Sequence, residues 1–214
     1  NKTEVVVIWG AQPSVSETAE SGRGMAELRA AGVKTVVVDP NFSPDAVKAD
    51  VWLPVRPGTD TAMAMAWLSI IINEDLYDHD FVDRWCYGFD EYRERVREWT
   101  PERAAEICWC PAEKIYAAAR LIGTAGVTTL QWGVAFDQTK WANGTAHAAV
   151  AVQALTGNID NPGGFVGINF GYVQSDIREN ICKGMGKQVR EGRLGDGKYA
   201  LRTVGFGPHS MGDD

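Results

Sequence analysis

The sequence predicts an α/β fold in which a doubly wound, mostly parallel sheet is flanked by helices. Short apolar runs rich in β-branched residues alternate with longer helical segments, and three of these runs lead into a Gly turn or an Asp. These three runs are found in the segments VVVIWGAQPS at 5–14, VVVDPN at 36–41 and PVRPGTD at 54–60. Alternating strands and helices are typical of parallel sheets, which bind nucleotides at the carboxyl ends of their strands.

The expected elements can be placed along the chain. The strands cover 4–9, 35–38, 51–55 and 127–132, and the first is a continuous apolar run, as in a strand buried on both faces. The helices cover about 24–31, 61–74, parts of 74–122 and 141–156. The helix at 61–74 is apolar nearly all round, so we expect it to be buried. The segment 74–122 is amphipathic, with aromatic residues at four-residue spacing in Phe81, Trp85 and Phe89. This order of elements gives a Rossmann-like sheet.

The chain changes character near residue 164. Residues 1–164 have the pattern of one α/β domain, whereas 165–214 contain ten glycines and a charged middle, KQVREGRLGDGK at 187–198. Such a segment cannot form a core of its own, so it is either disordered or, as we expect, an irregular segment that belongs to an adjacent domain of a longer protein. The first expected strand begins only a few residues into the chain, which predicts a fragment of a longer protein.

Composition excludes several classes of function. The net charge of −7 argues against unaided binding to nucleic acid or to an anionic membrane surface. No apolar run reaches the ~18 residues that span a bilayer, and no signal-peptide pattern is present, so the compartment stays open. The cysteines have unsuitable spacing for a metal site, and we expect buried free thiols at Cys86, Cys108, Cys110 and Cys182.

The first turn, WGAQP at 9–13, follows a buried strand directly. Gly10 lets the backbone turn closely, and the amides exposed by such a turn can bind a pyrophosphate. The fingerprint for NAD has three glycines as G-x-G-x-x-G, and this turn has Gly10 alone. The turn therefore fits either a dinucleotide other than NAD or a plain tight turn.

Asp39 follows the second expected strand. An acid at this place in a doubly wound fold commonly accepts hydrogen bonds from ribose hydroxyls. It lies 29 residues after Gly10, further than the ~20 of the NAD motif. Because Asp39 precedes Pro40, an ordinary turn is the alternative.

Asp60 ends the motif RPGTD at 56–60. Guanine presents two adjacent donors, N1–H and the N2 amino group, and one carboxylate accepts both. Adenine presents an acceptor beside its donor and would be repelled by the same group. The alternative is that Asp60 caps the helix that follows, and both roles can hold together.

Together these segments resemble the molybdopterin guanine dinucleotide-binding region of molybdenum or tungsten oxidoreductases of the dimethyl sulfoxide reductase type. Members of that family show a WG-x-N-P turn, DPR after the next strand, RPGTD opening an apolar helix, and later a Gln, LTGN and PGG. This chain has, in the same order, WGAQP at 9–13, DPN at 39–41, RPGTD at 56–60, Gln138, LTGN at 155–158 and NPGG at 161–164. The resemblance covers roughly residues 4–165.

The resemblance implies a domain that holds the guanosine and pyrophosphate of one pterin in a bis-molybdopterin guanine dinucleotide enzyme. It implies cofactor contacts from Trp9, Gly10, Ala11, Gln12, Pro13, Ser16, Asp39, Pro40, Asn41, Ser43, Gly58, Thr59, Asp60 and Gln138. Two positions depart from the family pattern. Gln12 replaces an Asn, which changes reach more than chemistry, and Asn41 replaces an Arg, which removes a cation that could face phosphate.

In that family the protein ligand to molybdenum or tungsten, and any iron–sulfur cluster, come from segments upstream of the matched region. The resemblance therefore implies no catalytic or metal-binding residue here and no activity in this chain alone. It implies the remaining domains of the same polypeptide as partners and allows an iron–sulfur electron-transfer subunit. The family's chemistry is oxygen-atom transfer, two-electron oxidation or, in some tungsten members, hydration.

Two alternatives stay open. One is an NAD(P)-dependent dehydrogenase domain, against which the single glycine of the first turn and the Asp60 turn count. The other is a non-catalytic scaffold relative in an electron-transfer complex, against which the presence of both Asp39 and Asp60 counts.

Overall fold

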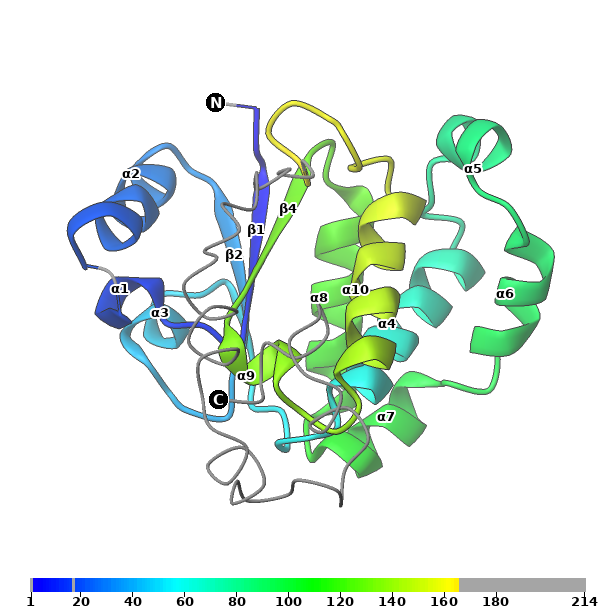
Figure 1. The fold of residues 1–214 in the computed structure, drawn as a ribbon, viewed down its shortest axis with the longest axis horizontal. Coiled ribbons are helices and arrows are strands. Elements are labelled where there is room, and N and C mark those ends of the chain that lie inside the picture. Colours follow the sequence, from blue (N-terminus) through cyan, green and yellow to red (C-terminus); the bar gives the residue numbers. More distant parts are fainter. Residues whose placement is uncertain (1, 17, 166–214) are drawn as a thin grey trace, which may run out of the picture. The chain divides into compact units, whose positions relative to one another are not determined.

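A computed structural model describes residues 2–16 and 18–165 of the chain (Figure 1). These residues belong to one compact unit, and the fold below is that of this unit. The irregular segment expected at 165–214 lies outside the described residues, with the exception of Phe165.

The sheet has four strands, all parallel, in the order β3-β2-β1-β4. The strands are β1 (Val5–Trp9), β2 (Lys34–Val38), β3 (Val51–Leu53) and β4 (Thr128–Trp132). Trp9, at the end of β1, pairs with Val38 of β2 on one side and with Trp132 of β4 on the other. The expected strands and the parallel doubly wound arrangement are confirmed, and the third strand ends two residues earlier than expected.

The helices cover most of the rest of the described chain. They are α1 (Pro13–Ser16), the π-helical turn η1 (Thr18–Gly22), α2 (Arg23–Ala30), α3 (Pro44–Val47), α4 (Asp60–Asn73), α5 (His79–Trp85), α6 (Phe89–Val96), α7 (Pro101–Cys108), α8 (Ala112–Thr124), α9 (Val134–Asp137) and α10 (Ala142–Leu155). The long helices were expected from their periodicity. Four short elements, α1, η1, α3 and α9, were not, because four or five residues are too few to show a period.

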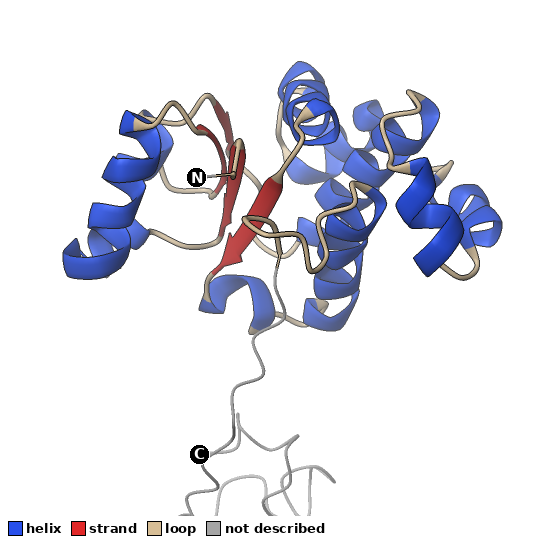
Figure 2. Cartoon of the chain, turned by 90° about the horizontal axis from the view of Figure 1, so that it is seen from above, coloured by secondary structure: helices blue, strands red, loops and turns tan. Residues whose placement is uncertain are grey.

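The sheet has a separate hydrophobic cluster on each face, as the alternation of side chains along a strand requires. Val6 and Ile8 of β1 pack with Met25 of α2, while Val5, Val7 and Trp9 join the larger cluster on the opposite face. Figure 2 shows the helices in layers on both sides of the sheet. All five residues of β1 are buried, as expected for a central parallel strand.

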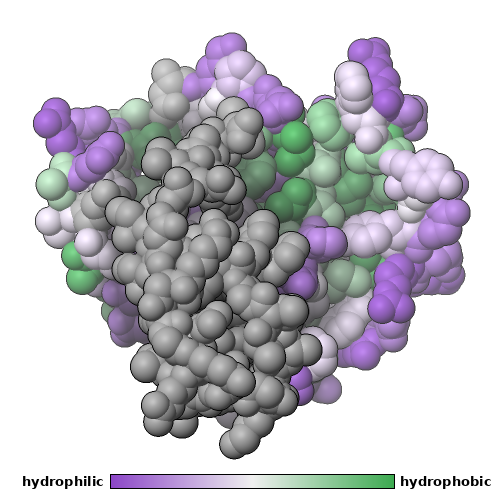
Figure 3. All heavy atoms as spheres, viewed as in Figure 1, coloured by the Kyte–Doolittle hydropathy of each residue, from purple (hydrophilic) through white to green (hydrophobic). Residues whose placement is uncertain are grey.

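Helix α4 is the centre of the larger layer. Every residue from Ala62 to Ile72 is buried, because α6, α7, α8 and α10 surround it. The expectation of a buried, apolar helix is confirmed. In Figure 3 hydrophobic surface gathers over the α4 and α10 region, whereas the α2 and α5 ends are mostly hydrophilic. Across the described residues, no helix is both long enough and apolar enough to cross a bilayer.

The aromatic repeat in 74–122 does not form one continuous helical stripe. Gly88, in a left-handed conformation with φ 75°, separates α5 from α6. The side chain of Trp85, the middle member of the repeat, is 76% exposed. The four-residue spacing is therefore interrupted by a change of chain direction, and only parts of this segment face the core.

The order of the strands fixes where the loops meet. The chain passes from β1 outward to β2 and β3 and then crosses to β4 on the other side of β1. In doubly wound folds, ligands bind at such a reversal, outside the carboxyl ends of the strands, here those of β1 and β4. The two strand ends approach closely there, since the Gly133 amide donates to the Trp9 carbonyl at 3.0 Å.

We predict that Gly133→Ala lowers the free energy of unfolding by about 1–3 kcal/mol or more, because the added Cβ would collide with the Gly10 carbonyl and press on Ala11. Gly24→Ala in α2 is the matched control, since its Cβ would meet no atom within 4 Å. This control should gain up to about 1 kcal/mol from helix propensity. Urea denaturation of both variants checks the prediction, and equal stabilities would contradict it.

Candidate functional site

Four loops come together at the carboxyl edge of the sheet, the lower edge in Figure 1. They follow β1, β2, β3 and β4, and the residues to which the sequence assigned cofactor contacts lie in these loops or at the ends of the strands and helices that they join. Parallel strands bring the loops that follow them to one edge, so the predicted site residues are gathered by the topology.

Two backbone amides in the loop after β1 donate no hydrogen bond within the described residues. The other amides of this turn are engaged, because those of Gly10, Ser14, Val15 and Ser16 donate to Val38, Asp45 and Gln12. Pro13 has no N–H and is buried. Among the described residues, the amides of Ala11 and Gln12 donate no hydrogen bond. These two adjacent N–H groups are the part of the turn that can bind an anion.

A buried ion pair that the sequence analysis missed holds this turn in place. The Asp45 carboxylate is fully buried and accepts from the Ser14 amide at 3.0 Å, from the Ser14 hydroxyl at 2.5 Å and from the Arg29 guanidinium at 2.8 Å. Burial raises the pKa of Asp45, but the hydrogen bonds from Ser14 and Arg29 outweigh it, so the pKa lies below its usual value. The pair joins α1, α2 and α3.

Asp39 is buried directly after β2. Burial raises the pKa of its carboxyl group, partly offset by hydrogen bonds from the Asn41 amide, at 2.7 Å, and from the Gln12 side chain. The Trp52 indole also donates to the Asp39 carbonyl at 2.9 Å. Asp39 is held in one orientation next to the β1 turn.

The rest of the β2 loop divides into exposed and buried parts. Pro40 and Asn41 are exposed, as a contact with a ligand requires. Ser43 is 1% exposed, and its hydroxyl accepts from the Ala46 amide at 3.2 Å as the N-cap of α3. Its side chain is therefore already engaged in the fold. The sequence carries the signal of this cap, a Ser followed by Pro44 at the first helical position.

The loop after β3 is a tight turn that ends directly before Asp60, the first residue of α4. The Thr59 amide donates to the Arg56 carbonyl at 3.2 Å, with Pro57 second and Gly58, at φ 82°, third in the turn. Pro and a positive-φ Gly at these places are typical of a type II turn. The end of α7 supports it, since the Arg56 amide donates to the Cys108 carbonyl at 2.8 Å. Gly58 is exposed, with open space where a Cβ would point.

Asp60 does not cap α4, as the sequence suggested it could. The N-cap is Thr59, and Asp60 is the first residue of the helix. Its Oδ1 instead accepts from the indole Nε1–H of Trp9 at 2.8 Å. No described residue donates to Oδ2, so one carboxylate oxygen of the half-buried Asp60 is available.

Trp9 and Gln138 occupy opposite environments. Trp9 is 1% exposed, with its ring packed edge-on against Trp67 and Phe136 at centroid distances of 4.9 and 5.4 Å. Its side chain belongs to the core and reaches the site only through Asp60. Gln138 is exposed and follows α9, so it lies at the same edge as the other loops.

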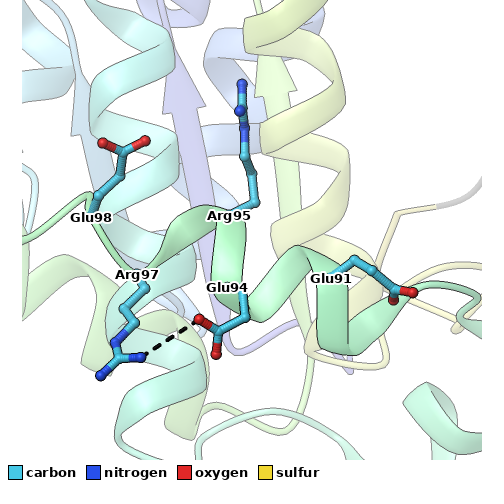
Figure 4. Close-up of a pocket in the computed structure, with 5 residues that line it drawn as sticks. All are labelled: Glu91, Glu94, Arg95, Arg97 and Glu98. Atoms are coloured by element: carbon cyan, nitrogen blue, oxygen red, sulfur yellow. Dashed lines mark ion pairs between the residues drawn. The ribbon is translucent and has the colours of Figure 1, made fainter.

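Other charged and sulfur-containing groups form no comparable site. The residues around a surface hollow at α6, including Glu91, Arg95 and Glu98, point in different directions (Figure 4). Cys108 and Cys110 are buried, and burial raises the pKa of both thiols, that of Cys110 to about 11. Within 2–16 and 18–165 no three His, Cys, Asp or Glu side chains gather as metal ligands.

Comparison with known proteins identifies the family. The sequence profile described as molybdopterin oxidoreductase matches residues 1–206. The chain belongs to the molybdopterin oxidoreductase family. This confirms the resemblance on which the cofactor-binding residues were assigned.

Relatives in the family match this region and extend well beyond it. The chain is 38% identical over 180 residues to acetylene hydratase of Syntrophotalea acetylenica, covering 83% of this chain and 25% of that protein. It is 32% identical over 193 residues to a dimethyl sulfoxide reductase of Haemophilus influenzae, and this match covers 77% of this chain and 23% of that protein. The solved acetylene hydratase of Pelobacter acetylenicus matches with a TM-score of 0.67 at 34% identity, covering 73% of this chain and 22% of that one. The chain spans about a quarter of the length of these relatives.

We predict that Asp45→Asn lowers the free energy of unfolding at pH 7 by about 3–5 kcal/mol, because it leaves the guanidinium of Arg29, whose side chain is only 19% exposed, without its counter-charge. The pKa of Asp45 is lower in the folded state than the ~3.9 of an unfolded chain. Its stabilisation is therefore present above about pH 4 and lost as the pH falls through the folded value. The stability of Asp45→Asn should fall less steeply in this acid range than that of the wild type.

Glu27→Gln is the control for this prediction. It breaks the Arg23–Glu27 ion pair, whose side chains are 77% and 64% exposed, so it should change stability by less than about 0.5 kcal/mol. Chemical denaturation between pH 2 and pH 7 compares the two variants. Equal effects at pH 7 would contradict the structural role given to Asp45.

Proposed function

We propose that this chain binds the guanosine and pyrophosphate of one molybdopterin guanine dinucleotide within a molybdenum or tungsten bis-pterin oxidoreductase. The observation that carries the proposal is the convergence of three complementary groups at one edge of the sheet. These are the two free amides of Ala11 and Gln12, the buried Asp39 carboxylate, and the half-buried Asp60 carboxylate with an available oxygen.

Each group suits one part of the nucleotide. Adjacent backbone N–H groups at a strand end bind pyrophosphate oxygens. A carboxylate after the second strand accepts from ribose hydroxyls. Asp60 accepts from the two donors of guanine, and the open space beside Gly58 leaves room for a ligand close to the backbone. We place Ser16, Pro40, Asn41, Thr59 and Gln138 around this path, with Gln138 toward the pterin.

Ser43, Pro13 and Trp9 enter the proposal indirectly. Their side chains are buried, and those of Ser43 and Trp9 already make hydrogen bonds within the fold. They shape the loops that carry the contacts. Domain 1–164 would thus present its loops to the cofactor, with 165–214 belonging to a neighbouring domain.

The cofactor, when bound, would supply the metal and its oxidation, oxygen-transfer or hydration chemistry, and this chain would bind and orient it. Relatives named for different substrates, such as acetylene hydratase, dimethyl sulfoxide reductase and formate dehydrogenase H, all match this region. A shared cofactor explains this better than a shared substrate does. We therefore assign substrate choice, the protein ligand to the metal, and any iron–sulfur cluster or electron-transfer subunit to segments outside this chain. The chain alone should bind nucleotide without catalysing a reaction.

We predict that the 214-residue chain binds GDP in preference to ADP and NAD, with a Kd in the millimolar range because the site is only part of a complete one. Asp60→Asn should weaken GDP binding by at least about tenfold, since an amide NH₂ would oppose the guanine donors. Asp80→Asn controls for net charge, because Asp80 is an exposed acid on α5. NMR titration measures all three ligands. Tighter binding of NAD than of GDP would favour the dehydrogenase alternative.

A second prediction concerns the ribose. Asp39→Asn should weaken GDP binding but leave binding of 2′,3′-dideoxy-GDP unchanged, because the hydroxyls that Asp39 would accept from are absent in that analogue. The same variant should be at least as stable as the wild type at pH 7. The raised pKa of Asp39 means that its ionised form costs stability above that pKa, and the amide removes this cost. Equal losses for both nucleotides would place Asp39 away from the ribose.

A further inference from the structure

The hydrogen bond between Trp9 and Asp60 connects the core of the protein with the group assigned to guanine. The two residues are 51 positions apart in the sequence, at the end of β1 and the start of α4. We propose that Trp9 is a positioning residue that sets the preference of the site for guanine over adenine by fixing the Asp60 carboxylate. The inference rests on the proposed function and adds to it a residue that does not touch the nucleotide.

Because Trp9 is buried, its side chain cannot contact a nucleotide directly. At 1% exposure, its side chain presents no surface to a ligand at the sheet edge. Its one polar atom, Nε1, is 2.8 Å from Asp60 Oδ1. Any influence of this side chain on nucleotide binding must therefore pass through Asp60 or through the stability of the core.

The indole itself is held rigidly. Trp67, two turns further along α4 than Asp60, contacts one part of the ring, and Phe136 of α9 contacts another. Both partners are themselves buried. Aromatic side chains packed in this way keep one orientation, so the N–H points at a fixed place and Asp60 Oδ1 is fixed with it.

A fixed carboxylate discriminates between bases more sharply than a free one. With Oδ1 held by Trp9, Oδ2 and the remaining lone pair of Oδ1 can accept the two parallel donors of guanine. A mobile carboxylate could rotate away from the acceptor of adenine and keep a single hydrogen bond. The Trp9 bond prevents this rotation, so the repulsion of adenine is retained. Because Asp60 is already ordered in the free protein, guanine binding does not have to pay the entropy cost of fixing this side chain.

Trp67 provides a matched control within the same cluster. It is also a buried tryptophan, but its indole nitrogen has no hydrogen-bond partner in the described part of the chain. Trp67→Phe and Trp9→Phe both remove an indole ring from this core and leave a phenyl ring. They differ in that only Trp9→Phe removes a donor from Asp60. A general effect of a looser core should appear in both variants.

The experiment is to measure the Kd of GDP and of ADP for the wild-type 214-residue chain and the two variants. Trp9→Phe should reduce the ratio of the GDP affinity to the ADP affinity by about tenfold, equivalent to about 1.4 kcal/mol. Trp67→Phe should reduce this ratio by much less, because it loosens the packing of the Trp9 ring but keeps the Nε1–H donor to Asp60. In an Asp60→Asn background the Trp9→Phe effect should disappear, because there is no carboxylate to position. A ratio that is unchanged in Trp9→Phe, or equally changed in both variants, would overturn the inference.

A measurement on the wild type covers the case in which Trp9→Phe does not fold. GDP should shift the ¹⁵N–¹H indole resonance of Trp9 although the nucleotide does not contact this side chain, and Asp60→Asn should abolish the shift. GDP binding that leaves the Trp9 resonance unmoved would overturn the inference alone. A wild-type chain that binds no GDP would overturn the proposed function and the inference together.

Discussion

The central position of β1 is the constraint on which the rest of the unit depends. This strand pairs with β2 on one edge and β4 on the other, and helices cover both of its faces. A chain that leaves such a strand must turn at once, because there is no free edge or face to continue along. The Trp9 carbonyl accepts from the Gly133 amide after β4, and the amides of Ala11 and Gln12 in the turn donate no hydrogen bond within the described residues. The geometry of the loop that we propose for nucleotide binding is thus a consequence of how the core closes.

Three buried or half-buried carboxylates at this edge are stabilised in three different ways. Asp45 is paired with the charged Arg29 and has a lowered pKa, so its carboxylate stabilises the fold and has no need of a ligand. Asp39 has only neutral donors and a raised pKa, and Asp60 has a single indole donor. Carboxylates with incomplete partners inside a protein retain capacity for further hydrogen bonds. This contrast separates the two acids assigned to the ligand from the one that holds the loops.

The sequence was sufficient for the fold, but not for the side-chain contacts among the predicted site residues. Continuous apolar runs and helical periods identified the four strands and the long helices, and the parallel topology brings the predicted residues to one edge of the sheet. The partners of Asp60 and Asp45 were missed because Trp9, Ser14 and Arg29 are distant in sequence and no spacing rule connects them. Trp85 was misjudged for a related reason, since a regular spacing does not reveal a break at Gly88. Side-chain contacts across loops depend on tertiary packing, which local patterns do not encode.

The Asp45 ion pair also has a consequence for the way the protein opens. Because one carboxylate joins α1, α2 and α3, none of these elements can leave the sheet without exposing or breaking the buried pair. Native-state hydrogen exchange should therefore report this side of the sheet as one cooperative unit rather than as three independently fraying helices. Within that unit, the first turn after β1 would keep its shape until the whole layer detaches.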